Sequence, residues 1–464
     1  VVVDAITLNG LQLNLTKAAD GRTNWDDLAQ PVKRDQKPES PESGGPALAA
    51  FAIGRIEINN AIFSWRDDAA GARYTIRDFD LVTGSVALSE PIDLKLTLTL
   101  EQVAPPRRVP VNLDVQLMVN EAGLELRTID LRADDSRITG TVNLRFNEPV
   151  YRFDLVLDQI DIDKYLSAPD GAASDAKVPA VDAASKPEPV EISLALLRTL
   201  NVQGKLAIGK LKAFGIRSEQ VVVQAQARNG QIMFGPNSAK LYGGSYAGHT
   251  AFDVSGATPR LRFDEKLTTV QLGSFLKDAA VFDNYSGTGN VELKLTAQGS
   301  DAAAIKRTLN GDVAIDLRDG KIEGVNFQKM VQQARAVYDQ ARGQAVEAKP
   351  KAGDTTAFQA LTATMRVTNG VVRNDDLSLT GPLVAATGAG TADLVKETFD
   401  YGLKVTLTEE VVRKSVTVPV HISGTFTKPR YRPEFGEVLK EKAQQAIEKK
   451  LDKKLDKLRQ KLLR

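Results

Sequence analysis

The chain contains no cysteine and only two histidines, His249 and His421, among its 464 residues. The absence of cysteine excludes disulfide bonds, thiolate metal sites and cysteine nucleophiles. Two histidines leave almost nothing from which to build histidine-based catalysis or a multi-histidine metal site. We therefore expect neither a metal nor a cofactor.

The chain also lacks a strong net charge and a long apolar run. Its formal net charge is +1, which provides no general electrostatic attraction for nucleic acid. No run approaches the roughly 18 to 20 apolar residues that are needed to span a bilayer. Residues Val1 to Leu8 are typical of a strand rather than a signal peptide, and the missing initial Met indicates a processed or truncated chain. Any membrane anchor would then lie upstream of Val1.

What the sequence has in abundance is alternation of apolar and polar residues, most clearly between Ile92 and Leu157. A period of two predicts half-buried strands with one apolar and one polar face. We expect a mainly β fold in which a long, serially extended antiparallel sheet curls into an open apolar groove, accompanied by a few short helices. The residues predicted to line this groove and bind lipid are Leu94, Leu96, Leu98, Leu100, Val111, Leu113, Val115, Leu117, Leu124, Leu126, Val142, Leu144, Phe146, Phe153, Leu155 and Leu157.

Composition divides the chain into parts. Residues 1–167 form a first β-groove module, in which residues 29–50 are rich in Pro, Ser, Gly and charge and are predicted to be a mobile loop. Residues 168–190 contain almost no large apolar side chain, which predicts a disordered linker or loop. Residues 191–432 form a second β-groove module with helical interruptions, and residues 433–464 form a basic amphipathic helix.

Within the second module, helical periodicity predicts interruptions at residues 272–281, 302–309 and 327–342. The stretch from Gly140 to Leu166 also resembles the stretch from Gly248 to Leu276. A repeat of this kind indicates a sheet extended by serial addition of strand groups.

The C-terminal segment carries ten Lys or Arg and five Asp or Glu between Glu437 and Arg464. A basic amphipathic helix is typical of reversible docking on an anionic membrane face. A coiled-coil or self-packing role remains the alternative for this helix. The residues predicted to contact the membrane are Leu439, Ile447, Leu451, Leu455, Leu458, Leu462, Lys450, Lys454, Lys457 and Lys461.

No catalytic motif is evident. The acidic pairs Asp67–Asp68, Asp134–Asp135 and Asp375–Asp376 lie in turns or on the polar phase of strands, where solvated surface is the expected role. Neither histidine stands in a recognisable nucleophile setting. The sequence therefore predicts a protein that is not an enzyme, and a carbohydrate-active β enzyme, which would depend on such an acidic pair, is the least favoured alternative.

A series of short motifs occurs in order from about Val3 to Phe435. They are Gly21 with Asn24–Leu28, Ile160–Leu166, Leu241–Gly244, Gly311, Asp319–Val325, Leu377–Gly381, Val418–Val420, Gly424–Thr425 and Pro429. In this order and spacing the chain resembles the AsmA family of Gram-negative envelope proteins, which is related in architecture to chorein-type bridge lipid-transfer proteins.

The resemblance implies a periplasmic body tethered to the inner membrane by a helix upstream of Val1. It also implies a role in phospholipid transport between the inner and outer membranes and in outer-membrane homeostasis. The expected partners are phospholipid, a membrane surface contacted by the C-terminal helix, and the inner membrane, but not nucleic acid. The alternative is a structural or assembly factor for outer-membrane proteins, whose groove is filled by its own side chains and conducts no lipid.

Overall fold

The computed structural model describes residues 2–26, 52–68, 72–102, 107–147, 149–166, 194–279, 285–323, 326–327, 329, 354–382, 384–408 and 415–433. These residues form mainly β-strands, with four short helices among them. They divide into two compact units, Val1–Phe234 and Gly235–Arg464.

Unit 1 contains strands of two to fourteen residues and two short helices. Its elements are β1 (Val2–Val3), β2 (Ile6–Asn9), β3 (Gln12–Lys17), β4 (Ala52–Ile53), β5 (Ile56–Asp67), β6 (Ala72–Thr83), β7 (Ile92–Gln102), β8 (Arg107–Asn120), β9 (Gly123–Ala133), β10 (Ser136–Arg145), β11 (Tyr151–Asp161), α2 (Asp163–Leu166), α3 (Leu194–Thr199), β12 (Val202–Ala213) and β13 (Ile216–Arg228).

Unit 2 has the same character, and the boundary between the units falls inside β14 (Gln231–Leu241). Its further elements are β15 (Gly244–Asp253), β16 (Arg260–Gln271), α4 (Leu272–Asp278), β17 (Tyr285–Gln298), α5 (Ala302–Thr308), β18 (Asn310–Glu323), β19 (Thr355–Thr368), β20 (Val371–Thr380), β21 (Val384–Asp393), β22 (Thr398–Thr408), β23 (Ser415–Thr425) and β24 (Lys428–Pro433).

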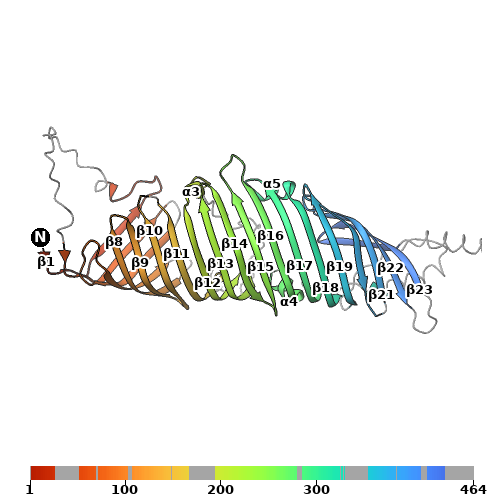
Figure 1. Cartoon of the computed structure of the whole chain (residues 1–464), viewed down its shortest axis with the longest axis horizontal. Helices are drawn as coiled ribbons and strands as arrows, with labels where there is room; N and C mark the ends of the chain where they lie inside the picture. The colour runs from red at the N-terminus through yellow and green to blue at the C-terminus, as the bar shows by residue number, and fades with distance from the viewer. Residues whose placement is uncertain are drawn as a thin grey trace, which may run out of the picture. The chain divides into compact units, whose positions relative to one another are not determined.

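The strands pair in series, each with its neighbours along the chain (Figure 1). β2, β3 and β5 to β24 belong to one 22-stranded sheet. Among its described strands, β24 pairs with β23 and not with β2 or β3, so the sheet is open. This confirms the predicted fold class. Helices α4 and α5 confirm two of the predicted interruptions, whereas most of residues 327–342, like residues 434–464, lies outside the described residues.

Three pairings in the sheet depart from the antiparallel rule. β2 and β3 both pair in parallel with β5, and β11 pairs in parallel with β12. A parallel neighbour requires a crossover connection, because the chain must return to the same end of the sheet. Between β11 and β12 that connection is the long segment that contains α2 and α3.

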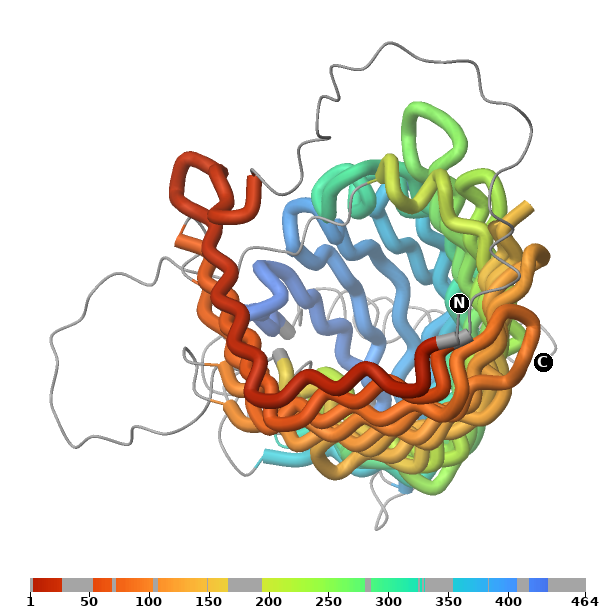
Figure 2. Tube along the Cα trace, turned by 90° about the vertical axis from the view of Figure 1, so that its left-hand side faces the viewer, coloured from red at the N-terminus to blue at the C-terminus, as the bar shows by residue number. Residues whose placement is uncertain are grey.

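Bulges bend many of these strands partway along their length. Asn60, Asp78, Gln220, Thr269 and Asp319 lie inside strands with φ between 48° and 56°, the left-handed region that non-glycine residues rarely adopt. A bulge bends its strand and shifts the pairing register, as it does on either side of Asp78. Figure 2 shows the strands of unit 1, coloured red to yellow-green, turning part of the way along their length.

Side chains from neighbouring strands satisfy the backbone groups that the bulges leave unpaired. The N–H of Asn60 donates to Asp80 Oδ1 at 2.7 Å, and the N–H of Thr269 donates to Asn290 Oδ1 at 2.9 Å. Because unpaired backbone donors are costly when shielded from water, these bonds hold the bends in place. The sheet is therefore curved by specific residues at specific positions.

Candidate functional site

One row of apolar side chains crosses the sheet of unit 1. Its ten members stand directly opposite one another in nine successive ladders, which makes the row continuous within that unit. The row consists of Leu8, Ile58, Leu81, Leu96, Leu113, Leu131, Ile138, Leu157, Ile208 and Val221.

This row is only partly shielded from solvent. Leu8 is 43% exposed, the members from Ile58 to Ile138 are half-buried, and only the last members fall below 9%. On the opposite face of β7, Asp93, Lys95 and Thr97 are exposed. Since side chains on the inner side of a bend shield one another, this difference indicates that the apolar face lies on the inside of the curve.

The groove candidates from the sequence lie on this half-buried face, with few exceptions. Val115 and Leu157 are buried at 5% exposure, and Phe146 is exposed at 48% because it lies beyond the end of β10. The remaining candidates are all half-buried, neither sealed in a core nor fully in water. Their contact with lipid stays a prediction.

The corresponding row in unit 2 is buried. It runs through Val270, Gly289, Leu317, Leu361, Leu379, Ala386, Val405 and Val418, which are paired from β16 to β23. None of its apolar side chains exceeds 9% exposure, and Val270 and Val405 are at 0%. A closed apolar layer therefore occupies this part of unit 2.

The chain's own side chains cover the buried row at identifiable places. Leu272 of α4 is 5% exposed, and a Cβ added to Gly289 of β17 would lie 2.7 Å from Leu272 Cδ1 and 2.6 Å from Leu317 Cδ2. Glycine at this position thus lets α4 pack against the sheet. Phe327 and Phe358, at 6% and 3% exposure, add two further rings to the buried layer.

Polar groups interrupt the apolar face of unit 2, and the sequence analysis missed them. Tyr401 Oη donates to Asn374 Oδ1, and Asn374 is 5% exposed. Burial raises the pKa of Tyr401 to about 12, with Asp376 and Asp375 adding to the effect. In β16, Glu265 occupies the same alternating phase as Phe263 and Leu267. The broken alternation was the available signal, but Asp264 and Lys266 on either side made Glu265 look like ordinary surface charge.

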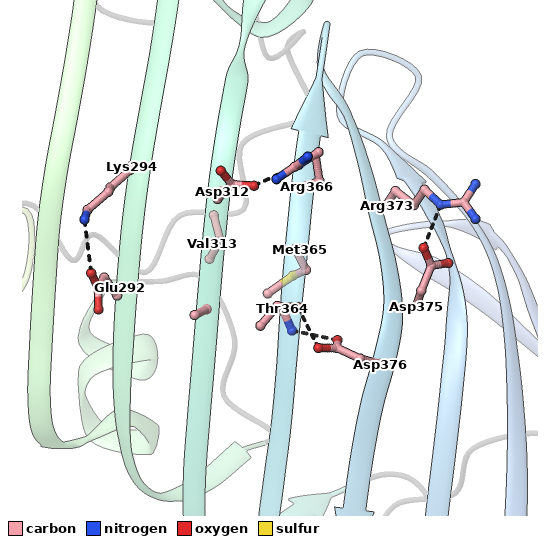
Figure 3. A pocket seen from close by; sticks show the side chains of 11 residues that line it. Glu292, Lys294, Asp312, Val313, Thr364, Met365, Arg366, Arg373, Asp375 and Asp376 are labelled. Atoms are coloured by element: carbon pink, nitrogen blue, oxygen red, sulfur yellow. Dashed lines mark hydrogen bonds and ion pairs between the residues drawn. The ribbon is translucent and has the colours of Figure 1, made fainter.

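Unit 2 contains a hollow of about 650 Å³ that is lined by seven charged side chains together with Val313, Ala314, Thr364 and Met365. Figure 3 shows the ion pairs Lys294–Glu292 at 3.5 Å, Arg366–Asp312 at 3.0 Å and Arg373–Asp375 at 2.9 Å. Exposed pairs of this kind contribute about 0 to 1 kcal/mol each. Because each of these charges already has a partner, the hollow is a solvated, salt-bridged surface.

The acidic pairs have structural partners. Asp67 contacts Lys17 at 3.3 Å, and Asp135 contacts Lys164 at 2.5 Å. Asp376 accepts hydrogen bonds from the Thr364 side chain at 2.6 Å and its N–H at 2.8 Å, which lower the pKa of Asp376. Within the described ranges, no group of three or more His, Cys, Asp or Glu side chains is arranged to hold a metal ion.

Two of the short sequence motifs contain side chains, Asn24 and Asp163, that form hydrogen bonds with the backbone of neighbouring segments. The Asn24 side chain accepts from the N–H of Thr16 at 2.9 Å and donates to the carbonyl of Asn14 at 2.8 Å, so it pairs with β3. Asp163 accepts from the N–H of Gly215 at 2.9 Å and from that of Phe214 at 2.5 Å. These hydrogen bonds, the one from Gly215 first, lower the pKa of Asp163. Asn24 and Asp163 thus fix the ends of strands.

The predicted C-terminal membrane helix at residues 433–464 falls almost wholly outside the described residues. No helix among the residues that the structure does describe is both long enough and apolar enough to span a bilayer.

Comparison with known proteins identifies the relationship. The AsmA family model matches residues 108–377, which is more than half of the chain. Protein AsmA from Escherichia coli (strain K12) is 24% identical over 346 residues, covering 69% of this chain and 54% of the relative. The chain thus spans about half the length of this curated relative. No solved structure matches the chain. The matched region includes six of the ten members of the unit 1 row and four of the eight members of the unit 2 row, and the chain belongs to the AsmA family.

Proposed function

We propose that this protein is a non-enzymatic periplasmic lipid-binding protein that supports phospholipid transport between the inner and outer membranes. Membership of the AsmA family implies an envelope-related role. The proposal of lipid binding rests on the unit 1 row from Leu8 to Val221. Most members of this row are half-buried and so remain partly accessible to solvent across successive strands. Extended exposed apolar surface on a folded protein is typical of a binding site.

The size of the hydrophobic effect favours acyl chains as the ligand. Two acyl chains together contain about 30 methylenes, and burial of each methylene is worth about 0.8 kcal/mol. Exposing both chains to water therefore costs on the order of 24 kcal/mol. A continuous apolar row lowers that cost along its whole length, whereas an isolated pocket lowers it only locally. Acyl chains would lie along the row while headgroups stay in water.

Photo-crosslinking tests this proposal. A photoreactive residue at Leu96 or Leu155 is expected to capture phospholipid in protein purified from membranes. The matched control is Asp154, which neighbours Leu155 in β11 but belongs to the exposed opposite face. Equal capture at Leu155 and Asp154, together with no phospholipid in native mass spectrometry, would contradict lipid binding.

A triple substitution separates binding from folding. Leu96→Asp, Leu113→Asp and Leu155→Asp together are expected to abolish lipid crosslinking while thermal unfolding stays cooperative, because all three side chains are half-buried and their charges can reach water. Global unfolding of the triple variant would show that these residues form a closed core.

The buried row of unit 2 favours the second candidate, a structural or assembly role, for that unit. Leu379 is 3% exposed and Val405 is fully buried, so this layer is filled by the protein's own side chains. A photoreactive group at Leu379 is expected to crosslink within the protein. Phospholipid captured at Leu379 would instead extend the lipid-binding role to this layer.

A further inference from the structure

Glu265 is a carboxylate at an apolar position. In β16 the residues Leu261, Phe263, Glu265 and Leu267 are half-buried, and the intervening Arg262, Asp264 and Lys266 are exposed. Glu265 is therefore on the apolar face, opposite Leu293 of β17 and Gly248 of β15. A charge in such a place is costly unless it is hydrogen-bonded or paired.

Two hydroxyl groups of β15 hold this carboxylate. Tyr246 Oη donates to Glu265 Oε2 at 2.5 Å, and Thr250 Oγ1 donates to Glu265 Oε1 at 2.7 Å. Burial first, and then the hydrogen bond to Glu265, raise the pKa of Tyr246, so its hydroxyl keeps the proton that it donates. Two hydroxyl donors on β15 thus face the Glu265 carboxyl group.

Gly248 provides the space in which the carboxylate lies. It stands between Tyr246 and Thr250 in β15, and a Cβ at this position would collide with Glu265 Oε2. Glu265, Tyr246, Thr250 and Gly248 together form what we call the carboxylate cradle, and all four lie within unit 2.

The carboxylate of the cradle has acceptor capacity left. A carboxylate offers about four lone-pair positions, of which the two hydroxyls occupy two, and Thr250 Oγ1 keeps acceptor capacity of its own. The Tyr246 hydroxyl also has a hydrogen bond with the Asn237 side chain. No ion pair joins Glu265 to a basic side chain within the part of the chain that the structure describes; Lys266 contacts Glu292 instead. Glu265 is half-buried, so a ligand can reach it.

The chemistry of the cradle selects the kind of cation. A divalent metal ion prefers several carboxylate and carbonyl ligands, and the cradle has one carboxylate. A trimethylammonium group has no N–H to donate and is recognised by aromatic cages. A primary ammonium donates a hydrogen bond through each N–H, and the Glu265 carboxylate and Thr250 Oγ1 supply acceptors on one side.

We propose that the carboxylate cradle binds the primary ammonium of a phospholipid headgroup, so that the half-buried patch around Glu265, which is separate from the buried row of unit 2, distinguishes ethanolamine lipids from choline lipids. This inference rests on the proposed lipid-binding function and names a headgroup for it. The acyl chains of the bound lipid would contact the flanking Phe263, Leu267 and Leu293, which are half-buried on the same face.

Competition in native mass spectrometry tests the inference. The full chain is incubated with mixed micelles that contain equal amounts of ethanolamine and choline phospholipids with identical acyl chains. We expect wild type to retain the ethanolamine lipid about tenfold over the choline lipid, the size of one charge-assisted hydrogen bond. Glu265→Gln is expected to bring this ratio below about twofold, because the amide is neutral.

Two further variants control for folding and for charge. Gly248→Ala keeps the charge of Glu265 but displaces its carboxylate, and it is expected to lower the ratio as well. Glu292→Gln removes a carboxylate from the polar face of β17, and it is expected to leave the ratio unchanged. Thermal unfolding of each variant verifies that the fold is intact.

The outcomes separate the two proposals. Lipid retained without headgroup preference, or with the same preference in wild type and Glu265→Gln, overturns the cradle but leaves lipid binding standing. No retained lipid in any variant overturns both. Displacement of the ethanolamine lipid by glycerophosphoethanolamine, which has no acyl chains, would assign the cradle to a water-soluble amine and so overturn the headgroup assignment.

Discussion

Apolar and polar residues alternate along the strands of both units, but the apolar rows of the two units differ in their exposure to solvent. In unit 1, large aliphatic side chains such as Leu96 and Leu113 form a row that remains half-exposed. In unit 2, the row through Leu379 and Val405 is buried. Gly289, the aromatic rings of Phe327 and Phe358, and helix α4 contribute to the same packed layer. The same pairing pattern thus yields a partly solvent-exposed row in one unit and a packed layer in the other.

The largest expected effect is a charge placed in the packed layer. Val405→Asp puts a carboxylate where the side chain is 0% exposed, and an uncompensated buried charge costs about 3 kcal/mol or more. We expect loss of hydrogen-exchange protection in β21 to β23. Leu113→Asp, in the half-buried row of unit 1, is the matched control and is expected to leave exchange protection in unit 1 largely intact. Similar losses from both variants would erase the distinction between the units.

Truncation of a leucine gives the next largest difference. Leu379→Ala leaves a cavity beneath buried neighbours and is expected to lower the free energy of unfolding by about 2 to 5 kcal/mol. Leu113→Ala removes a side chain that is already partly in water, so about 1 kcal/mol is expected. Denaturant unfolding of the two variants measures both values, and a larger loss for Leu113→Ala would place the closed core in unit 1.

Substitution of Gly289, which contacts α4, tests how tightly the layer of unit 2 is packed. Gly289→Ala forces a methyl group toward Leu272 and Leu317, and overpacking of this kind costs about 1 to 3 kcal/mol. Gly402→Ala, whose added Cβ would meet only Ala389 O at 3.8 Å, is expected to cost much less. Equal thermal shifts for the two variants would mean that α4 does not press on the sheet at Gly289.

The smallest expected effect is a loss of folding stability at alkaline pH, caused by the partly buried phenol of Tyr401. The pKa of Tyr401 is raised to about 12 from 10.0, so the folded state favours the neutral phenol. This stabilisation is complete below pH 10 and is lost as the pH rises toward 12. Tyr401→Phe is expected to show a shallower loss of stability over that interval in chemical unfolding. An identical slope in wild type and variant would contradict a buried phenol.

Much of the fold was predictable because alternation reports the face of each strand directly. The serial strands and the helices at residues 272–278 and 302–308 followed from period two and from helical spacing. Burial was not predictable, since Leu96 and Leu379 both alternate with polar neighbours and differ only in what lies over them.

The bulges and the polar groups on the apolar face of unit 2 could not be predicted from the sequence either. Asp78 and Thr269 adopt a glycine-like φ without being glycine, so their bulges left no composition signal. Asn374 and Tyr401 meet only because β20 and β22 flank β21, a long-range effect of pairing.

Serial pairing has a consequence for how such a chain changes over evolutionary time. Each strand is held chiefly by its immediate neighbours, so insertion or loss of a complete hairpin preserves strand direction and leaves remote ladders undisturbed. Growth of the protein is then a matter of copying hairpins rather than redesigning a core, and homologues of very different length can keep the same architecture.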